Sequence, residues 1–222
     1  MGLKEKAYTT IKERIINCIY PPGSIINGKE LILELELSRT PFREAMNELA
    51  QEGLVEIVPY KGIYVSEITI KDIDDLYAIR DLLEPFAVEL AMDHIPRDVL
   101  ETYYESLRPY KDMDLEIPLK ACSKESVAED EDLHMMVLNY VNNALLVHTM
   151  MGFYDHTHRI RVLSHHKESV VIITGQQHLA IVECMLKGDK AGAKEAMHHH
   201  IISSKQRAFD TLLARKDRIY LK

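Results

Sequence analysis

The sequence contains no tryptophan, few aromatic residues and only three cysteines. Sparse aromatics beside 46% hydrophobic residues favour a helical protein with an aliphatic core over an all-β protein. Cys18, Cys122 and Cys184 are odd in number, far apart and form no CxxC pair, which is unlike a disulfide framework and favours a reducing compartment. We therefore expect a mainly α-helical protein.

Long apolar runs are also absent. No stretch approaches the ~20 apolar residues that a membrane-spanning helix needs. The first ten residues, MGLKEKAYTT, lack the apolar region of a signal peptide. The sequence thus predicts a cytoplasmic protein without a membrane partner.

The formal net charge of -8 does not by itself suggest a polyanionic partner. Residues 1–66, however, contain eight Lys and Arg against nine Glu and no Asp, which leaves 19 bases and 26 acids in the remainder. The negative charge therefore lies mostly in the C-terminal two-thirds. The N-terminal part is nearly neutral and can present a local basic patch.

Three helices are predicted in the N-terminal part. Residues 7–20 place apolar side chains at helical spacing, and PPG at residues 21–23 stops that helix. A second helix is predicted over residues 28–37. A third begins at Ser38, which can act as its N-cap. Its buried stripe is predicted at Phe42, Met46 and Leu49.

Two short strands follow the third helix. LVEIV and IYVSEI flank a PYKG turn in which Gly62 can supply a positive φ. Three helices and a β-hairpin make a winged helix-turn-helix, which we place at residues 1–66.

The remainder, residues 67–222, predicts an all-α domain of about six helices. Thr69 and Asp72 have the spacing of a capping box that opens a long helix. The helical periodicity breaks at residues 94–96, 111–118, 164–168 and 187–189. VVIIT at residues 170–174 is β-branched and has strand propensity, although we assign it to a helix.

The third helix carries the strongest functional signal in the N-terminal part. Arg39 and Arg43 are one turn apart, Thr40 lies beside them, and all project away from the apolar stripe. A recognition helix inserts such N-terminal residues into the major groove, where Arg binds guanine or phosphate. Lys61 at the wing tip would lie along the backbone or minor groove. The alternative is that these are ordinary solvated charges on a surface helix.

The segment SRTPFREAMNELAQEGLVEIVPYKGIYV closely resembles the signature of the GntR family of bacterial transcription regulators, and the match covers about residues 8–66. The resemblance implies operator binding. By this resemblance Gly62 shapes the wing, and the residues that contact DNA are Lys29, Ser38, Arg39, Thr40 and Arg43. Glu36 departs from the family, which usually has Gly in this turn, and it places an acid near the DNA.

Arg80 lies on the inward stripe of the long helix that follows the wing. Burying a guanidinium alone would cost several kcal/mol, so it must be paired or hydrogen-bonded. One interpretation is an internal salt bridge with Glu84, one turn on. The other is an arginine that binds an anion in a cavity.

Further along, Asp130 and His134 are spaced i and i+4, so a carboxylate and an imidazole share one helix face. Such a pair can offer two ligands to one metal ion, although a satisfied Asp–His pair in a core is at least as common. His178 and His200 lie on the apolar faces of two later helices. One Asp and three His would suit Zn, Mn, Ni or Fe.

These landmarks resemble the FCD-type ligand domain of the FadR subfamily of GntR regulators, over about residues 70–210. They are RDLLE at 80–84, DEDLH at 130–134, NALL at 143–146, HLAI at 178–181 and GD at 188–189. The resemblance implies a divalent metal, zinc first, that helps to hold a small carboxylate effector. It assigns as metal ligands Asp130, His134, His178 and His200. His198 and His199 flank His200, so the last ligand could shift in register. It assigns as effector-binding residues Arg80 and Asn143.

Our leading hypothesis is a transcriptional regulator without enzymatic activity, a homodimer on a palindromic operator, whose affinity changes when a small organic acid binds at the metal. One alternative is a metal-sensing or effector-free repressor in which the ion is the signal or purely structural. Another is a metalloenzyme fused to a DNA-binding module, although no nucleophile or general base accompanies the ligands.

Overall fold

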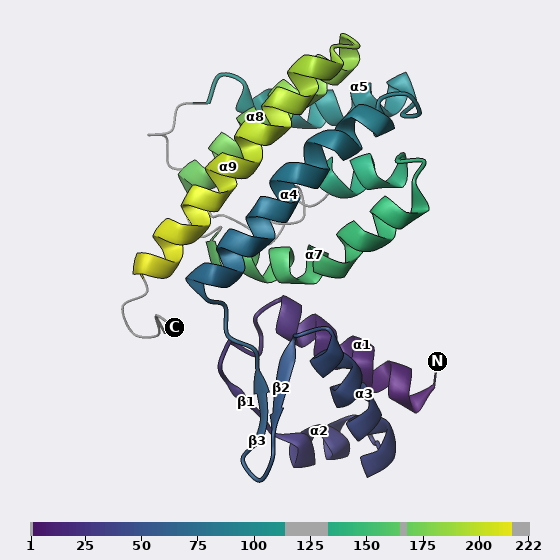
Figure 1. The fold of residues 1–222 in the computed structure, drawn as a ribbon, viewed down its shortest axis with the longest axis vertical. Coiled ribbons are helices and arrows are strands. Elements are labelled where there is room, and N and C mark those ends of the chain that lie inside the picture. The colour runs from purple at the N-terminus through teal and green to yellow at the C-terminus, as the bar shows by residue number, and fades with distance from the viewer. Residues whose placement is uncertain (1, 114–132, 165–167, 215–222) are drawn as a thin grey trace. The chain divides into compact units, whose positions relative to one another are not determined.

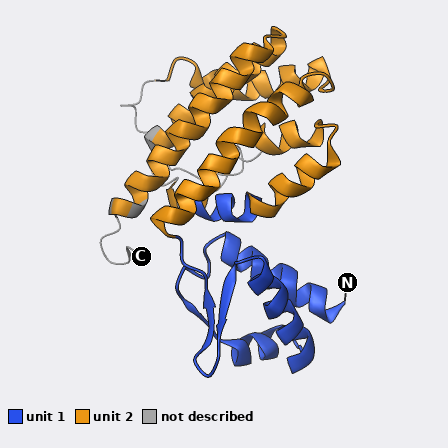
Figure 2. Cartoon of the chain, in the orientation of Figure 1, with its two compact units in different colours: residues 1–68, 154–160 blue, residues 69–153, 161–222 orange. Residues whose placement is uncertain are grey.

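A computed structural model of the chain describes residues 2–113, 133–164 and 168–214 (Figure 1). The chain divides into two compact units (Figure 2). Unit 1 comprises residues 1–68 together with 154–160, and unit 2 comprises residues 69–153 and 161–222. The fold is mainly helical with a small three-stranded sheet, so the predicted fold class is confirmed.

Unit 1 contains three helices, α1 (Leu3–Ile16), α2 (Gly28–Glu34) and α3 (Arg39–Gln51). Their apolar faces form one core, because the aliphatic residues recur every three or four positions. The predicted stripe of α3 is fully inside, at Phe42, Met46 and Leu49. Gly53, at φ 73°, ends this helix as expected.

The sheet of unit 1 has the strand order β1-β3-β2, with β1 (Ile25–Ile26), β2 (Val55–Val58) and β3 (Gly62–Val65). The predicted hairpin is β2 and β3, which pair antiparallel from Val55 opposite Val65 to Val58 opposite Gly62. The two-residue strand β1 pairs with β3 and was not predicted. Three helices and this hairpin form a winged helix-turn-helix.

Unit 1 also includes the middle of a helix from later in the chain, α7 (Ala144–Ser164). The ring nitrogen Nε2 of His156 lies 2.8 Å from the carbonyl oxygen of Glu52 at the end of α3. The Lys12 amine forms ion pairs with both Glu52 and Asp155, at 2.9 and 2.7 Å. The helix-turn-helix is therefore extended by a segment distant in sequence.

Unit 2 is built from helices. They are α4 (Ile70–Ala91), α5 (Arg97–Leu107), the 3-10 turn η1 (Arg108–Tyr110), a helical segment at residues 133–139, the outer parts of α7, α8 (Glu168–Leu186) and α9 (Lys190–Ala214). α9 packs along α4 and α8, as Figure 1 shows. The VVIIT run is helical, within α8, as we expected.

The capping box predicted at the start of α4 is confirmed. The Thr69 side chain accepts from the backbone N–H of Asp72, whose carboxylate accepts from the N–H of Thr69 at 2.8 Å. Two polar residues lie on the inward face of α4 among Ile73, Tyr77 and Ala87. These are Arg80 and Glu84, only 1% and 3% exposed, and they bring charge into the interior of unit 2.

Candidate functional site

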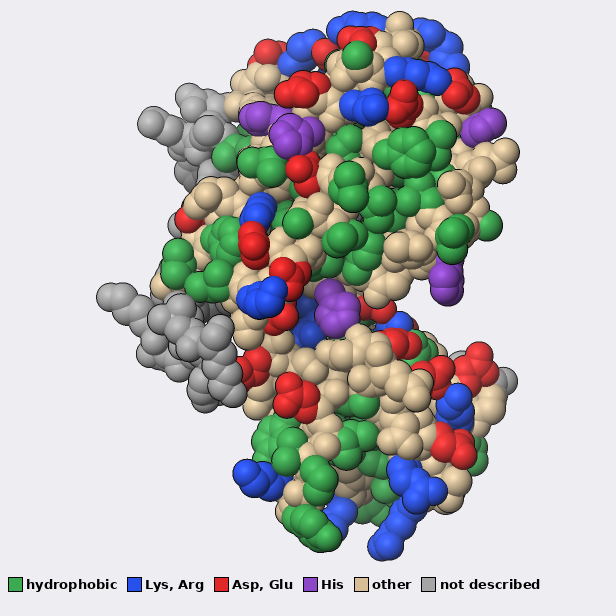
Figure 3. Space-filling view, viewed as in Figure 1, with side chains coloured by type: hydrophobic (Ala, Val, Ile, Leu, Met, Phe, Trp, Pro, Cys, Tyr) green, Lys and Arg blue, Asp and Glu red, His purple; other side chains and the backbone are tan. Residues whose placement is uncertain are grey.

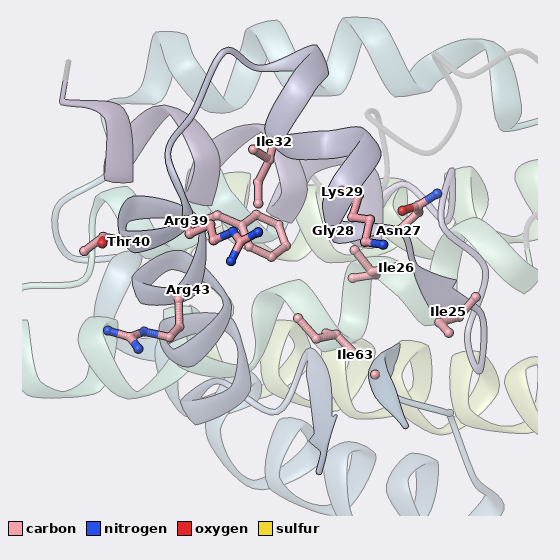
Figure 4. Close-up of a pocket in the computed structure, with 12 residues that line it drawn as sticks. Ile25, Ile26, Asn27, Gly28, Lys29, Ile32, Arg39, Thr40, Arg43 and Ile63 are labelled. Atoms are coloured by element: carbon pink, nitrogen blue, oxygen red, sulfur yellow. The ribbon is translucent and has the colours of Figure 1, made fainter. Parts of the chain in front are cut away.

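Five of the residues predicted to contact DNA line one groove of about 870 Å³ in unit 1. They are Lys29 from α2, Arg39, Thr40 and Arg43 from α3, and Gly62 from the wing. Figure 4 shows Lys29 and Arg39 pointing into the same space from two helices. The floor is apolar, with Ile26, Ile63 and Phe42 among its residues. Cationic side chains thus surround a recess that can accept a sugar–phosphate chain.

The start of α3 presents its polar side chains to solvent. Ser38 occupies the N-cap position, but its side chain makes no capping hydrogen bond, so its hydroxyl can serve a ligand. Arg39, Thr40 and Arg43 are all exposed. In the space-filling view of Figure 3, Lys and Arg side chains lie in separate patches along the lower end of unit 1. The arrangement fits a recognition helix.

The wing tip is held in an uncommon backbone conformation. Tyr60 has φ 63° and Gly62 has φ 131°. A positive φ is unfavourable for residues with a Cβ, and Gly62 supplies the freedom predicted for it. The turn leaves Tyr60 and Lys61 exposed at the tip. Both are available for contact with a surface beyond unit 1.

In unit 2, the structure brings three of the predicted metal ligands together. His134 comes from the segment at residues 133–139, His178 from α8 and His200 from α9, and each is at most 2% exposed. One ring nitrogen from each lies within 4.8 Å of the others. The Nε2 atoms of His134 and His200 are 3.2 Å apart. The fourth predicted ligand, Asp130, lies outside the described residues.

The three histidines of the His198-His199-His200 run differ in burial. His198 faces Asp81 at the surface, with Nδ1 2.5 Å from the carboxylate, and is 47% exposed in its side chain. His199 is exposed. Only His200 turns inward to join the cluster.

A buried ion pair supports His134 from α4. Arg80 Nε donates to Glu84 Oε1 at 2.6 Å, and the other carboxylate oxygen, Oε2, lies 2.6 Å from His134 Nδ1. Burial alone would raise the pKa of Glu84, but the charge of Arg80, with a smaller contribution from His134 where that ring is protonated, holds it far below its ordinary value. Burial lowers the pKa of His134 to about 4, although Glu84 opposes that shift. At neutral pH the carboxylate is ionised and the imidazole is neutral, the form that binds metals.

Two further polar residues surround the cluster. Gln177 Oε1 lies 3.2 Å from Nδ1 of His200. Arg161 of α7 is 1% exposed, and its charge contributes to lowering the pKa of His134. Sequence reasoning did not find either residue. Gln177 was missed because no apolar periodicity marks it as inward-facing beside His178. Arg161 was missed because three other basic or histidine residues lie near it in the same helix, so the sequence does not single it out.

The two predicted effector residues differ in their surroundings. Arg80 is buried beside the cluster and forms the salt bridge with Glu84 that the sequence left open as one interpretation. Asn143 is exposed and its side-chain oxygen accepts from the N–H of Leu146 at 3.0 Å, which caps the start of α7. Their contact with an effector stays a prediction. Glu84 was considered only as a partner of Arg80, and its contact with His134 was missed.

Comparison with known families and proteins shows which family the chain belongs to. The family of bacterial regulatory proteins, gntR family, matches residues 3–65, and the FCD domain family matches residues 75–203. The chain is a GntR-family regulator with an FCD domain. This GntR regulator is 28% identical over 196 residues to the HTH-type transcriptional regulator YdhC of Bacillus subtilis, covering 87% of this chain and 85% of YdhC.

Solved structures share the fold of this GntR regulator. McbR/YncC of E. coli superposes with a TM-score of 0.72 at 18% identity, covering 98% of this chain and 100% of that one. The Zn²⁺-bound FCD domain of TM0439 superposes with a TM-score of 0.53 at 19% identity, covering 67% of this chain and 99% of that one.

The protein is therefore a DNA-binding transcriptional regulator and not an enzyme. Within the part of the chain that the structure describes, no helix combines the length and apolarity needed to cross a membrane.

Proposed function

We propose that this GntR regulator binds its operator with an affinity that a small carboxylate changes by binding at a divalent metal in the FCD domain. His134, His178 and His200 would hold the ion, with Asp130 as the fourth predicted ligand. The observation that carries the proposal is the convergence of three buried imidazole nitrogens from three helical segments within 4.8 Å.

The spacing of these nitrogens suits one ion. Nitrogen ligands about 2.0–2.1 Å from a tetrahedral Zn²⁺ lie about 3.3 Å from one another. The Nε2 atoms of His134 and His200 are 3.2 Å apart. Neutral imidazoles also match Zn²⁺, Mn²⁺, Ni²⁺ or Fe²⁺, and the zinc found in the related FCD domain of TM0439 favours zinc here. The residues present therefore fit a divalent cation.

Charge favours an anionic effector at the same site. Arg80 balances Glu84, so the protein groups near the three imidazoles add little net charge from α4. A divalent ion held by neutral histidines stays positive even with one aspartate ligand. A carboxylate is the complementary metabolite group, because it offers a hard anionic oxygen to the metal. Arg80 and Asn143 remain the predicted residues for the rest of the effector.

On the DNA side, we propose that Ser38, Arg39, Thr40 and Arg43 enter the major groove. Lys29 would contact the phosphate backbone from α2, and Lys61 and Gly62 would place the wing against the minor groove or backbone. The shared groove of Lys29, Arg39, Arg43 and Gly62 supports this assignment. A single helix-turn-helix reads one half-site, so a palindromic operator needs two copies related by a two-fold axis.

The surface of α4 supports a homodimer. Ile79, Leu82 and Phe86 are 45%, 69% and 44% exposed, although each is a large apolar residue. They follow an i, i+3, i+7 spacing, which places them on one stripe of the helix. Figure 3 shows hydrophobic side chains gathered on this face of unit 2. We propose that a second copy covers this stripe, since the same patch on both partners is self-complementary in a two-fold dimer.

A thermal-shift screen of small carboxylates tests the proposed function. The protein is prepared with Zn²⁺ or with a chelator, and each acid that stabilises it is then added to an operator titration. A ligand that binds only the folded state raises apparent stability by RT ln(1 + [L]/Kd). We expect at least one acid to stabilise only the metal-loaded protein and to change operator affinity about 5- to 150-fold.

The same screen separates the alternatives. If metal alone changes operator affinity and no acid adds to the change, the protein is a metal sensor. If chelation lowers the melting temperature without altering operator affinity, with or without acids, the ion is structural. Either result contradicts the proposed response to a carboxylate.

A further inference from the structure

We propose that Glu84 and Gln177 are positioning residues that keep Nδ1 of His134 and of His200 protonated, so that both Nε2 atoms face one cation. The inference deepens the proposed function and rests on it. Neither residue would touch the metal. Each would act through the histidine that it holds.

The contact of Glu84 with His134 fixes one tautomer. Glu84 Oε2 lies 2.6 Å from His134 Nδ1. A carboxylate oxygen and a ring nitrogen that both present lone pairs would repel each other at this distance, and the carboxylate cannot donate, so we infer that Nδ1 carries the hydrogen. In the neutral ring this leaves Nε2 with a lone pair, and Nε2 is the atom that lies 3.2 Å from His200.

Gln177 acts on His200 in the same way from α8. Its Oε1 lies 3.2 Å from Nδ1 of His200. An amide oxygen is an acceptor, so His200 also carries its hydrogen on Nδ1. Two lone pairs then face each other across 3.2 Å, which is unfavourable alone and favourable around a shared cation. The two contacts therefore prepare the cluster for metal.

The positioning of His134 would explain why the Arg80–Glu84 ion pair on α4 is buried. Arg80 and Glu84 are 1% and 3% exposed, and the desolvation of such a pair commonly offsets much of its attraction. Arg80 Nε holds one carboxylate oxygen of Glu84 at 2.6 Å, which leaves the other oxygen aimed at His134. A carboxylate behind a metal-bound histidine orients the ring and strengthens it as a ligand. The pair thus serves the geometry of His134.

The two supports differ in charge. His134 is held by a carboxylate, whereas His200 is held by a neutral amide. A carboxylate partner makes the imidazole the more basic ligand. His134 should therefore be the stronger of the two ligands, and replacing Gln177 with Glu should strengthen His200.

Two readouts on the full-length protein test this inference. Zn²⁺ affinity is measured by competition with a chromophoric chelator. The tautomers of His134 and His200 are read from long-range ¹H–¹⁵N NMR spectra of the metal-free protein. The variants are Gln177→Leu, which removes the acceptor at similar size, and Gln177→Glu, which keeps it. Gln176→Leu is the matched control, since the neighbouring Gln176 donates to the carbonyls of Tyr110 and Met113 instead.

We expect Gln177→Leu to lower Zn²⁺ affinity about 10- to 100-fold and to shift His200 toward the Nε2–H tautomer. Gln177→Glu should keep the Nδ1–H tautomer and bind Zn²⁺ at least as tightly as wild type. Gln176→Leu should change neither readout beyond about threefold. A second arm, Glu84→Gln, should lower the affinity by about tenfold or more.

Unchanged Zn²⁺ affinity and an unchanged His200 tautomer in Gln177→Leu would overturn the inference. The failure of the proposed function looks different, because the wild-type protein would then take up no divalent metal. The tautomer spectra still decide the positioning role in that case. If Glu84→Gln does not fold, the Gln177 variants decide the outcome.

Discussion

Glu36 shows how one residue can depart from the local rule of its position. It lies in the turn between α2 and α3 at φ 56°, an uncommon conformation for a residue with a Cβ. Its backbone N–H donates to the carbonyl of Leu33, and that of Leu37 donates to Ile32, so the turn fixes this conformation. The resemblance to the GntR family marked this position as unusual, because the family usually has Gly here, and the structure shows the positive φ.

We predict that Glu36→Gly stabilises the protein. Gly adopts a positive φ without strain, and this gain should exceed its larger loss of backbone entropy by about 0.5 kcal/mol or more. Glu36 is exposed, so little side-chain contact is lost. The midpoint of urea unfolding measures the change. Gly53→Ala is the control in the opposite direction, since Gly53 has φ 73° and should lose stability. A lower midpoint for Glu36→Gly would contradict the strain argument.

A second residue-scale prediction concerns Arg80. Because its guanidinium pairs with the buried Glu84 at 2.6 Å, Arg80→Ala leaves a carboxylate without its cation in the interior. We expect a loss of about 3–5 kcal/mol in unfolding free energy. Arg97→Ala, which breaks an exposed i, i+4 pair with Glu101, should have little effect. If both changes lower the unfolding free energy by an equally small amount, Arg80 does not stabilise the fold through Glu84. Effector binding would then be the remaining role predicted for Arg80.

At the scale of elements, α3 is the part of unit 1 that we assign to sequence recognition. Arg43 projects away from the buried stripe and lines the groove with Lys29 and Arg39. We predict that Arg43→Ala weakens specific operator binding by about 1–3 kcal/mol, if the contact is bidentate to guanine, and leaves folding intact. Electrophoretic mobility shifts at fixed salt provide the measurement. Arg108→Ala, an exposed Arg on η1, serves as control. Operator affinity equal to wild type in Arg43→Ala would remove α3 from the interface.

Elements with strong periodicity were predictable, and short or long-range features were not. The helix α3, the β2–β3 hairpin and the capping box of α4 each rest on signals within a few residues, and all three are found. The first helix was predicted at residues 7–20 but spans Leu3–Ile16, so it lies four residues earlier, because the chain turns at Cys18 with φ 53°. The strand β1 has two residues, too few for an alternating pattern, and exists only through pairing with β3.

In the candidate site, too, features encoded locally could be predicted and contacts between separate helices could not. His134, His178 and His200 lie on apolar helix faces, so their burial could be predicted, and the resemblance to the FCD domain joined them. The contacts of Glu84 and Gln177 depend on how separate helices pack, which no local spacing encodes. A polar residue on an inward stripe, such as Glu84, was nevertheless a usable signal.

For the whole molecule, the apolar stripe of α4 predicts assembly. Leu82 is 69% exposed at the centre of the stripe with Ile79 and Phe86. We predict that Leu82→Glu shifts the protein from dimer to monomer in sedimentation velocity and lowers operator affinity, because a buried charge at a two-fold interface meets its own copy. Ile202→Glu, on α9 at 46% exposure, is the control and should remain dimeric. A dimeric Leu82→Glu protein would exclude this face as the interface.

Elemental analysis of the purified protein tests most directly whether the buried histidine cluster binds a divalent metal. Three proteins are compared: wild type, His134→Ala with His178→Ala, and His148→Ala with His199→Ala. The last pair is exposed and serves as the matched control. We predict about one metal ion per chain in wild type and in the control, and far less in the cluster variant. Full metal occupancy in the cluster variant, with its helical circular dichroism intact, would contradict the account.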